Sequence, residues 1–171
     1  MPPLLDRHHA ALPAPLHRLA LRHGFVVRRW WFKILKPRLS GVRMVILDAA
    51  GQTLLVKHTY GPQAWMVPGG HMRRAEDPLH AARREAQEEL SIDLADAKLV
   101  EVFTETVRGA HVTVHVVVAR ATAIPRPDSR EIAATVWFAA DALPPDASRA
   151  LPHQLPRWIA AWRIGGSVES G

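Results

Sequence analysis

The amino-acid sequence predicts an α/β domain in which helices cover both faces of a mixed β-sheet. Short apolar runs typical of strands recur from residue 42 to residue 140, and two helical patterns accompany them, one central and one late. The chain has 171 residues, 48% of them hydrophobic, which suffices for one domain with a sizeable core. It has no cysteine, so disulfide bonds and thiolate metal sites are excluded.

Three elements are expected in the first half of this domain. Residues 42–47 and 53–57 form a predicted hairpin around the turn DAAG. A helix is predicted over residues 78–90, because Asp77 is a favoured N-cap and Pro78 is well tolerated at the first helical position. Its apolar side chains recur at spacings of three and four, on one face: Leu79, Ala82, Ala86 and Leu90.

The second half of the domain is expected to complete the sheet and to cover it. The predicted strands are residues 98–106, 110–120 and 133–140. A closing helix is predicted over residues 155–164. Together these elements indicate one domain at residues 39–165, followed by a short tail at residues 166–171.

Positive charge is concentrated at the N-terminal end of the chain. Residues 1–43 hold nine Lys and Arg against one Asp, a net charge of +8, whereas the rest holds thirteen basic and fifteen acidic residues, a net charge of −2. A helix is predicted over residues 16–35, within a basic extension at residues 1–38. Its stretch RRWWFKILKPR is typical of contact with an anionic membrane surface or with RNA, but packing of its aromatic side chains against the domain is the favoured interpretation.

The sequence also bears on the location of the protein. No apolar run is long enough for a membrane-spanning helix, and the N-terminal segment lacks the apolar core of a signal peptide. The absence of cysteine is compatible with a reducing compartment. We therefore expect a cytoplasmic protein, and a homodimer is compatible with the sequence.

The motif that carries chemistry is the stretch GGHMRRAEDPLHAARREAQEELSI. On the predicted helix, Glu85, Glu88 and Glu89 fall within five positions, and spacings of three and four bring their carboxylates to one surface. Repulsion between like charges at these spacings costs about 0.2–0.5 kcal/mol per pair. Glutamates on a helix most often form a solvated face, so the flanking residues decide the interpretation.

The flanking pattern resembles the Nudix box, the signature of the Nudix hydrolase family, which has a loop–helix–loop arrangement. The matching positions are Gly70, Glu76, Arg84, Glu85, Glu88, Glu89 and Ile92. Ser91 stands where the family pattern has glycine, just after the helix. A left-handed conformation there would cost a serine about 1–2 kcal/mol.

The resemblance implies a Nudix-like α/β/α sandwich and a pyrophosphohydrolase that acts on phosphorus-containing acid anhydrides. The expected reaction is the Mg²⁺-dependent hydrolysis of a diphosphate bond in a nucleoside diphosphate linked to another moiety, with Mn²⁺ as an alternative metal. A bound divalent cation makes clustered carboxylates favourable, since it neutralises their charge and polarises the phosphoryl oxygens.

The resemblance also implies roles for individual residues. The implied metal ligands are Glu85, Glu88, Glu89 and the backbone carbonyl of Gly70. Glu85 is also expected to help to activate water, and Arg84 is expected to orient Glu85 or Glu76 through a charge-assisted hydrogen bond. In several family members a further acidic residue on a late loop supplies a base or a ligand. Glu131 fits that location, with Asp128 as the reserve candidate.

The expected substrate-binding residues lie in or just before the lead-in WMVPGG, which also resembles the family. They are Gly69, Gly70, Trp65 and Tyr60, of which the two aromatic residues would stack on a base, although ordinary packing is favoured for Trp65. Family subgroups are sorted by residues downstream of the box. The stretch ETVRGAH has neither the proline associated with ADP-ribose hydrolysis nor the tyrosine associated with dinucleoside polyphosphates.

Two functions are therefore carried forward from the sequence. The first is a hydrolase, for which an ADP-sugar and a nucleoside triphosphate both stay open as substrates. The alternative is a catalytically silent Nudix domain that senses a nucleotide or binds RNA. A silent domain would be expected to have lost glutamates of the box, and this chain keeps them.

Overall fold

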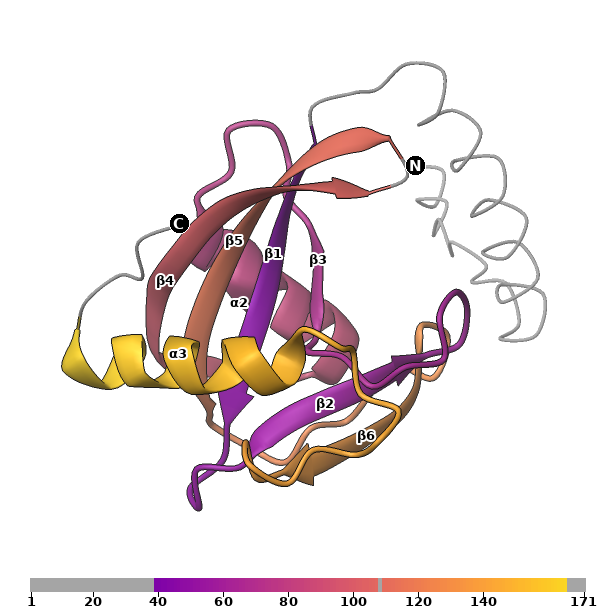
Figure 1. Ribbon diagram of the computed structural model, residues 1–171, viewed down its shortest axis with the longest axis vertical. Coiled ribbons are helices and arrows are strands. Elements are labelled where there is room, and N and C mark those ends of the chain that lie inside the picture. The colour runs from indigo at the N-terminus through magenta and orange to yellow at the C-terminus, as the bar shows by residue number, and fades with distance from the viewer. Residues whose placement is uncertain (1–38, 108, 166–171) are drawn as a thin grey trace, which may run out of the picture.

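The computed structural model describes residues 39–107 and 109–165. The predicted helix at residues 16–35, the extension at residues 1–38 and the tail at residues 166–171 lie outside the described residues. The elements in chain order are β1 (Leu39–Leu47), β2 (Thr53–His58), β3 (Gly69–His71), α2 (Pro78–Leu90), β4 (Leu94–Val107), β5 (Ala110–Ala121), β6 (Ile132–Phe138) and α3 (Leu151–Ile164) (Figure 1).

The strands form one six-stranded mixed sheet. Its order is β4-β5-β1-β2-β6, and β3 pairs with β1 beside this path. The β1–β5 pair is parallel, whereas the other pairs are antiparallel. The predicted α/β class with a mixed sheet is therefore confirmed.

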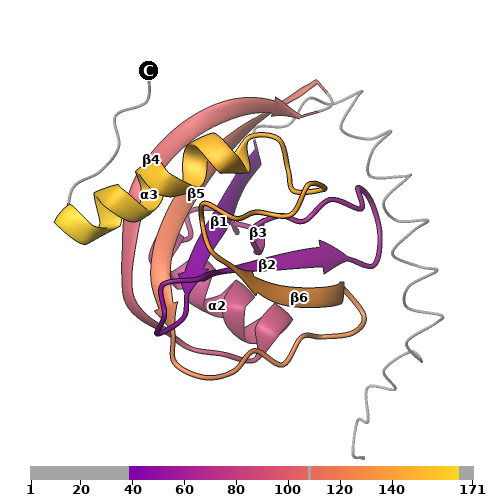
Figure 2. The same ribbon diagram turned by 60° about the horizontal axis from the view of Figure 1, so that its bottom comes forward.

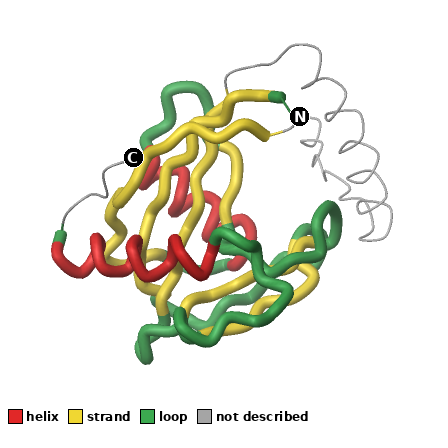
Figure 3. The backbone as a smooth tube through the Cα atoms, viewed as in Figure 1, coloured by secondary structure: helices red, strands yellow, loops and turns green. Residues whose placement is uncertain are grey.

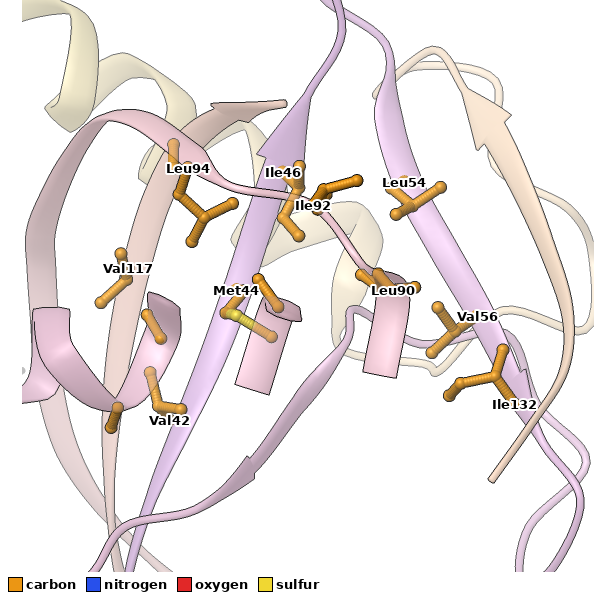
Figure 4. Close-up of a cluster of buried hydrophobic side chains, with 14 of the residues drawn as sticks. Val42, Met44, Ile46, Leu54, Val56, Leu90, Ile92, Leu94, Val117 and Ile132 are labelled. Carbon is orange, nitrogen blue, oxygen red and sulfur yellow. The ribbon is translucent and has the colours of Figure 1, made fainter. Parts of the chain in front are cut away.

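The two helices lie on opposite faces of this sheet, as Figures 1 and 2 show. Alternation along β1 explains how one strand serves both faces, because Met44 and Ile46 pack in the cluster under α2 whereas Val45 and Leu47 pack in the cluster under α3. Figure 4 shows the first cluster, where side chains of β1, β2 and β6 meet the end of α2 at Leu90. Two buried layers hold the helices in place.

The sheet opens between β1 and β2. The two strands pair at Leu47 and Thr53, and the other end of β1 pairs with β3 over Gly41–Arg43. Figure 1 shows β2 running away from β1 beyond the shared end. The short strand β3 was not predicted, since its residues belong to the glycine-rich lead-in, and it places this lead-in at the opening of the sheet.

Helix α3 begins four residues earlier than predicted, at Leu151. Pro152 is tolerated in the first turn, where the backbone N–H groups have no partner within the helix, but Pro156 lies further inside and removes one backbone hydrogen bond. Burial of Leu151, Leu155 and Trp158 outweighs that loss. The segment before α3, residues 139–150, is irregular (green in Figure 3).

A buried carboxylate ties α3 to the sheet. Glu101 of β4 is only 7% exposed, and it accepts hydrogen bonds from Nη2 of Arg157, at 3.0 Å, and from the indole Nε1 of Trp158. These two donors satisfy both carboxylate oxygens, which is what a buried charge requires. No helix in the described part of the chain is both long and apolar enough to cross a bilayer.

Helix α2 has the predicted boundaries. Oδ1 of Asp77 accepts hydrogen bonds from the backbone N–H groups of Leu79, at 2.9 Å, and His80, at 3.0 Å, which makes Asp77 the N-cap. The helix ends at Ser91, which adopts the left-handed conformation with φ 53° and ψ 41°. The serine therefore retains the turn for which the sequence motif has glycine.

We expect Ser91→Gly to stabilise the protein by about 1 kcal/mol, because glycine avoids the steric cost of the left-handed conformation. Urea unfolding monitored by circular dichroism measures the change. Ser91→Ala is the matched control, since alanine retains the Cβ atom and should leave the free energy of unfolding within about 0.5 kcal/mol of wild type. Equal stability of all three proteins would contradict the strain at this turn.

Candidate active site

Helix α2 turns two of its three glutamates inward and one outward. Glu85 and Glu89 are one turn apart and are 8% and 6% exposed, respectively. The side chain of Glu88 is 54% exposed. Glu85 and Glu89 line a cleft of about 540 Å³, together with Gly69 and Gly70. The cleft lies where the sheet opens between β1 and β2.

Arg84 connects this helix to the preceding loop. Its Nε and Nη2 atoms donate hydrogen bonds to the two oxygens of Glu76, both at 2.9 Å, and Nη2 also donates to the backbone carbonyl of His71 at 3.0 Å. Its Nη1 donates to Oε1 of Glu85 at 2.8 Å and to Oε2 of Glu88 at 3.2 Å. Hydrogen bonds, first those from Arg84 and then that from the backbone N–H of Arg73, lower the pKa of Glu76 to about 2. Arg84 therefore contacts both carboxylates that the sequence offered as its alternatives, Glu76 and Glu85.

We expect Arg84→Lys to lower kcat/KM by about ten- to a hundredfold, because an ammonium group cannot reproduce the planar fork that holds Glu76 while also reaching Glu85. Arg83→Lys is the matched control, since Arg83 is the exposed neighbour on the same helix and should tolerate the change. Steady-state kinetics on the two purified variants would decide between a positioning role and a general need for positive charge. Equal loss in both variants would contradict the positioning role.

The buried carboxylates have no sufficient neutralising partner. Burial first, and then the nearby carboxylates of Glu85 and Glu131, raise the pKa of Glu89 to about 8, against a smaller opposing effect of the Gly69 backbone. Burial also raises the pKa of Glu85, although Arg84 opposes this. Oε2 of Glu89 is buried and has no hydrogen-bond partner among the described residues.

This donor set fits a divalent cation. Carboxylates that burial disfavours as anions become favourable once a cation shares the site, and oxygen ligands suit Mg²⁺. Within residues 39–107 and 109–165, no three His, Asp or Glu side chains form a ready-made metal cage. The outward direction of Glu88 and its contact with Arg84 explain this, so two inward carboxylates form the acidic wall of the cleft.

Gly69 and Gly70 leave no room for a side chain. A Cβ atom on Gly70 would collide with the carboxylate of Glu85, and one on Gly69 would collide with the backbone carbonyl of Val42 in β1. The two glycines therefore allow β3 to fit between β1 and α2. Both glycines, which the sequence predicts to bind substrate, line the cleft together with Glu85 and Glu89.

The late acidic loop brings Glu131 to the cleft and leaves Asp128 outside its lining. The backbone N–H of Asp128 donates to the carbonyl of Glu89 at 2.8 Å, and the N–H of Arg126 donates to the carbonyl of Leu90 at 2.7 Å. These are carbonyls that the end of a helix leaves without a partner. The carbonyl of Asp128 in turn accepts the N–H of Glu131 at 3.0 Å. Asp128 thus shapes the loop that carries Glu131.

The two aromatic candidates, Tyr60 and Trp65, also differ in whether they line the cleft. Tyr60 lines the cleft, whereas Trp65 is not among its lining residues. Trp65 packs edge-on against Phe138 with ring centroids 5.8 Å apart, and Nζ of Lys57 lies 4.8 Å from its ring centroid. The structure therefore agrees with ordinary packing for Trp65. The sequence analysis missed His58, which lines the cleft beside Glu131, because a lone histidine at the end of a strand gives no motif.

A family model for the NUDIX domain matches residues 37–159 of the chain. This range covers every described strand and the residues of the acidic cleft. The chain belongs to the Nudix family. The predicted recognition and the predicted enzyme class, a Nudix hydrolase, are thereby confirmed, and Nudix hydrolases generally use divalent metals.

Relatives of this Nudix protein include solved structures and a curated enzyme. It is 30% identical to the MutT NUDIX hydrolase from Burkholderia pseudomallei, with a TM-score of 0.63 over 71% of this chain and 98% of that one. The Ap4A hydrolase of C. elegans shares the fold, with a TM-score of 0.61 at 23% identity over 74% of this chain and 98% of that one. An RNA pyrophosphohydrolase of Rhodospirillum rubrum is 37% identical over 54 residues, which span 32% of this chain and 33% of that relative.

Proposed function

We propose that this Nudix protein is a magnesium-dependent pyrophosphohydrolase that cleaves a diphosphate bond in a nucleotide derivative. The observation that carries the proposal is the buried pair Glu85 and Glu89, which faces a cleft of about 540 Å³ with the carboxylate of Glu131 beside it. A nucleotide is compatible with a cleft of this volume. Burial of a carboxylate is costly unless hydrogen bonds or a cation compensate it, and Oε2 of Glu89 has no hydrogen-bond partner among the described residues.

Each residue of the box would take a defined part in binding the metal. Glu85 and Glu89 would hold Mg²⁺ through their carboxylates, and the carbonyl of Gly70 would complete the ligand set with water and substrate oxygens. Glu88 would join as a ligand only by turning its carboxylate away from Arg84 and toward the cleft. Mn²⁺ is an alternative cation for the same oxygens. When bound, the cation would polarise the phosphoryl oxygens and offset the charge of the diphosphate.

Glu131 would act as the general base. Its carboxylate would accept a proton from the attacking water, whose oxygen forms a new bond to phosphorus while the anhydride P–O bond breaks. The products would be a nucleoside monophosphate and the phosphorylated second moiety. Arg84 would orient Glu85 through its hydrogen bond of 2.8 Å and would not itself contact the phosphates.

The identity of the substrate must be determined by experiment. The relatives are named for different substrates, an RNA in one case and Ap4A in another. The test is release of phosphate or pyrophosphate, or formation of a nucleoside monophosphate, from a panel of ADP-ribose, dinucleoside polyphosphates, nucleoside triphosphates and RNA with a 5′-triphosphate end. Each substrate is assayed with Mg²⁺, with Mn²⁺ and with EDTA.

We expect turnover of at least one panel member with a divalent cation and none with EDTA. The matched control is Glu131→Gln, which retains the shape of the side chain and removes the base, with an expected loss of about 10²- to 10⁴-fold in kcat. Nucleotide binding by calorimetry without turnover of any panel member would contradict the enzyme and support the silent sensor instead.

A further inference from the structure

His58 lies directly beside the proposed base and has no role so far. It is the last residue of β2, and it pairs with Ile132, the first residue of β6. The next residue of the loop, Thr59, donates its backbone N–H to the carbonyl of Glu131 at 2.8 Å. His58 and Glu131 both line the cleft. The backbone thus holds the two residues side by side.

The imidazole of His58 has an unused polar atom. Its Nδ1 is buried and has no hydrogen-bond partner among residues 39–107 and 109–165. Burial lowers the pKa of His58, so the ring is neutral at pH 7 and carries one N–H group. Glu131 raises the same pKa in two ways, through the charge of its carboxylate and through a hydrogen bond of its backbone carbonyl with the ring. A buried ring nitrogen without a partner is unfavourable, and the charged acceptor beside this ring is the carboxylate of Glu131.

The carboxylate of Glu131 is equally short of attractive partners. No hydrogen bond or ion pair of the described residues ends on its oxygens, although its backbone N–H and carbonyl are both bonded. Its charged neighbours Glu85 and Glu89 are acids, and each has its pKa raised by Glu131. Left alone, the base would turn away from these acids. The group beside it that can hold it toward the acidic wall is His58.

We propose that His58 is a positioning residue, whose neutral imidazole donates its Nδ1–H to the carboxylate of Glu131 and keeps this base aimed into the cleft. The imidazole would act only through Glu131 and would touch no reacting atom. This inference rests on the proposed function, because it assigns His58 a part in the reaction of the same site.

Kinetics of two variants and a matched control test the proposal. His58→Leu should lower kcat by about ten- to a hundredfold with KM changed less than about threefold, since the base loses its orientation while the substrate site stays intact. His58→Asn should recover most of kcat, because its amide N–H lies close to the place of Nδ1–H. His115→Leu is the control: Nδ1 of His115 is also buried without a partner, but His115 lies on β5 and does not line the cleft.

A double variant tests whether His58 acts through Glu131. If it does, His58→Leu placed on Glu131→Gln should lower kcat by less than about threefold further, because the base that His58 positions is already lost. Full activity of His58→Leu, equal loss in His115→Leu, or a loss that multiplies with that of Glu131→Gln would overturn the proposal. Thermal unfolding of each variant separates these outcomes from loss of folded protein.

A spectroscopic measurement needs no turnover. Nitrogen-15 spectra of the histidine rings report which ring nitrogen is protonated. We expect Glu131→Ala to shift the Nδ1 resonance of His58 and to leave that of His115 unchanged. An inactive wild-type protein would reject the proposed function. An unchanged His58 resonance in Glu131→Ala would reject the contact between His58 and Glu131. The two failures can therefore be told apart.

Discussion

Glu89→Gln is expected to lower kcat by about 10²- to 10³-fold while the protein stays folded, because the amide keeps the shape of the side chain but removes the charge that a divalent cation needs. Glu89 is the more deeply buried carboxylate of the acidic wall, and its Oε2 has no partner among the described residues. The variant therefore loses a metal ligand without exposing a cavity. Steady-state kinetics at saturating Mg²⁺ measures the loss.

The same variant should change how stability depends on pH and metal. Without metal, burial raises the pKa of Glu89 to about 8 in the folded state, above its ordinary value of 4.5. A raised carboxyl pKa stabilises the folded protein below pH 4.5, and this contribution is lost as the pH rises through about 8. The Tm of wild type should therefore fall, relative to that of Glu89→Gln, as the pH rises from 4.5 to about 8. Mg²⁺ should restore the Tm of wild type at pH 8 and should have little effect on the variant.

Glu101→Gln is the matched control for these measurements. Glu101 is a buried carboxylate like Glu89, but it lies outside the cleft and contacts Arg157 and Trp158. The change should lower Tm and leave both kcat and the Mg²⁺-dependent rise in Tm intact. Near-normal activity in Glu89→Gln, or an equal loss of the Mg²⁺ response in both variants, would remove the metal role of Glu89.

Gly70→Ala should produce the second large effect, a loss of about 10²-fold or more in kcat. The added Cβ atom would occupy the place of the Glu85 carboxylate, so the carboxylate must turn away from the cleft. A misplacement of about 1 Å in a catalytic group is enough for a loss of this size. Because the end of a side chain can move, the fold should survive with only a modest change in Tm.

Gly69→Ala provides the contrasting case one residue away. Here the added atom meets the backbone of Val42 and Arg43 in a buried strand, which cannot move aside without breaking the β1–β3 pairing. We therefore expect a much larger fall in Tm than for Gly70→Ala. We attribute the two effects to different causes: the Glu85 carboxylate can move away from the added atom, whereas strand β1 cannot. Comparable effects of the two variants on both Tm and kcat would contradict this explanation.

The helix and the inward carboxylates were predictable because their signals are local. Asp77 and Pro78 mark the start of α2 through their own backbone preferences, and Glu85 and Glu89 share one face through the helical repeat. The family resemblance then gave these residues a chemistry. Glu131 was found from its distance along the chain to a late strand, and the structure brings it to the cleft as expected.

Other features depend on contacts between distant segments, so local patterns do not reveal them. Strand β3 exists because β1 turns away from β2 and offers its edge to the glycine pair. The contact between Arg84 and Glu88 depends on where the loop places Glu76, because the same guanidinium group binds Glu76. The local sequence gives no reason to single out His58, whose place beside Glu131 depends on the distant loop that carries Glu131.

The hydrogen bonds from Arg126 and Asp128 to the end of α2 also divide the β5–β6 connection into two parts. Residues 122–124, before the first of these bonds, are exposed, and Ile124 is 85% exposed. A short peptide insertion or a fluorophore can therefore be introduced between Ala123 and Ile124, where the chain can bulge into solvent. The same insertion after Asp128 would displace Glu131, so only the first position suits a labelled version of the protein that is meant to work.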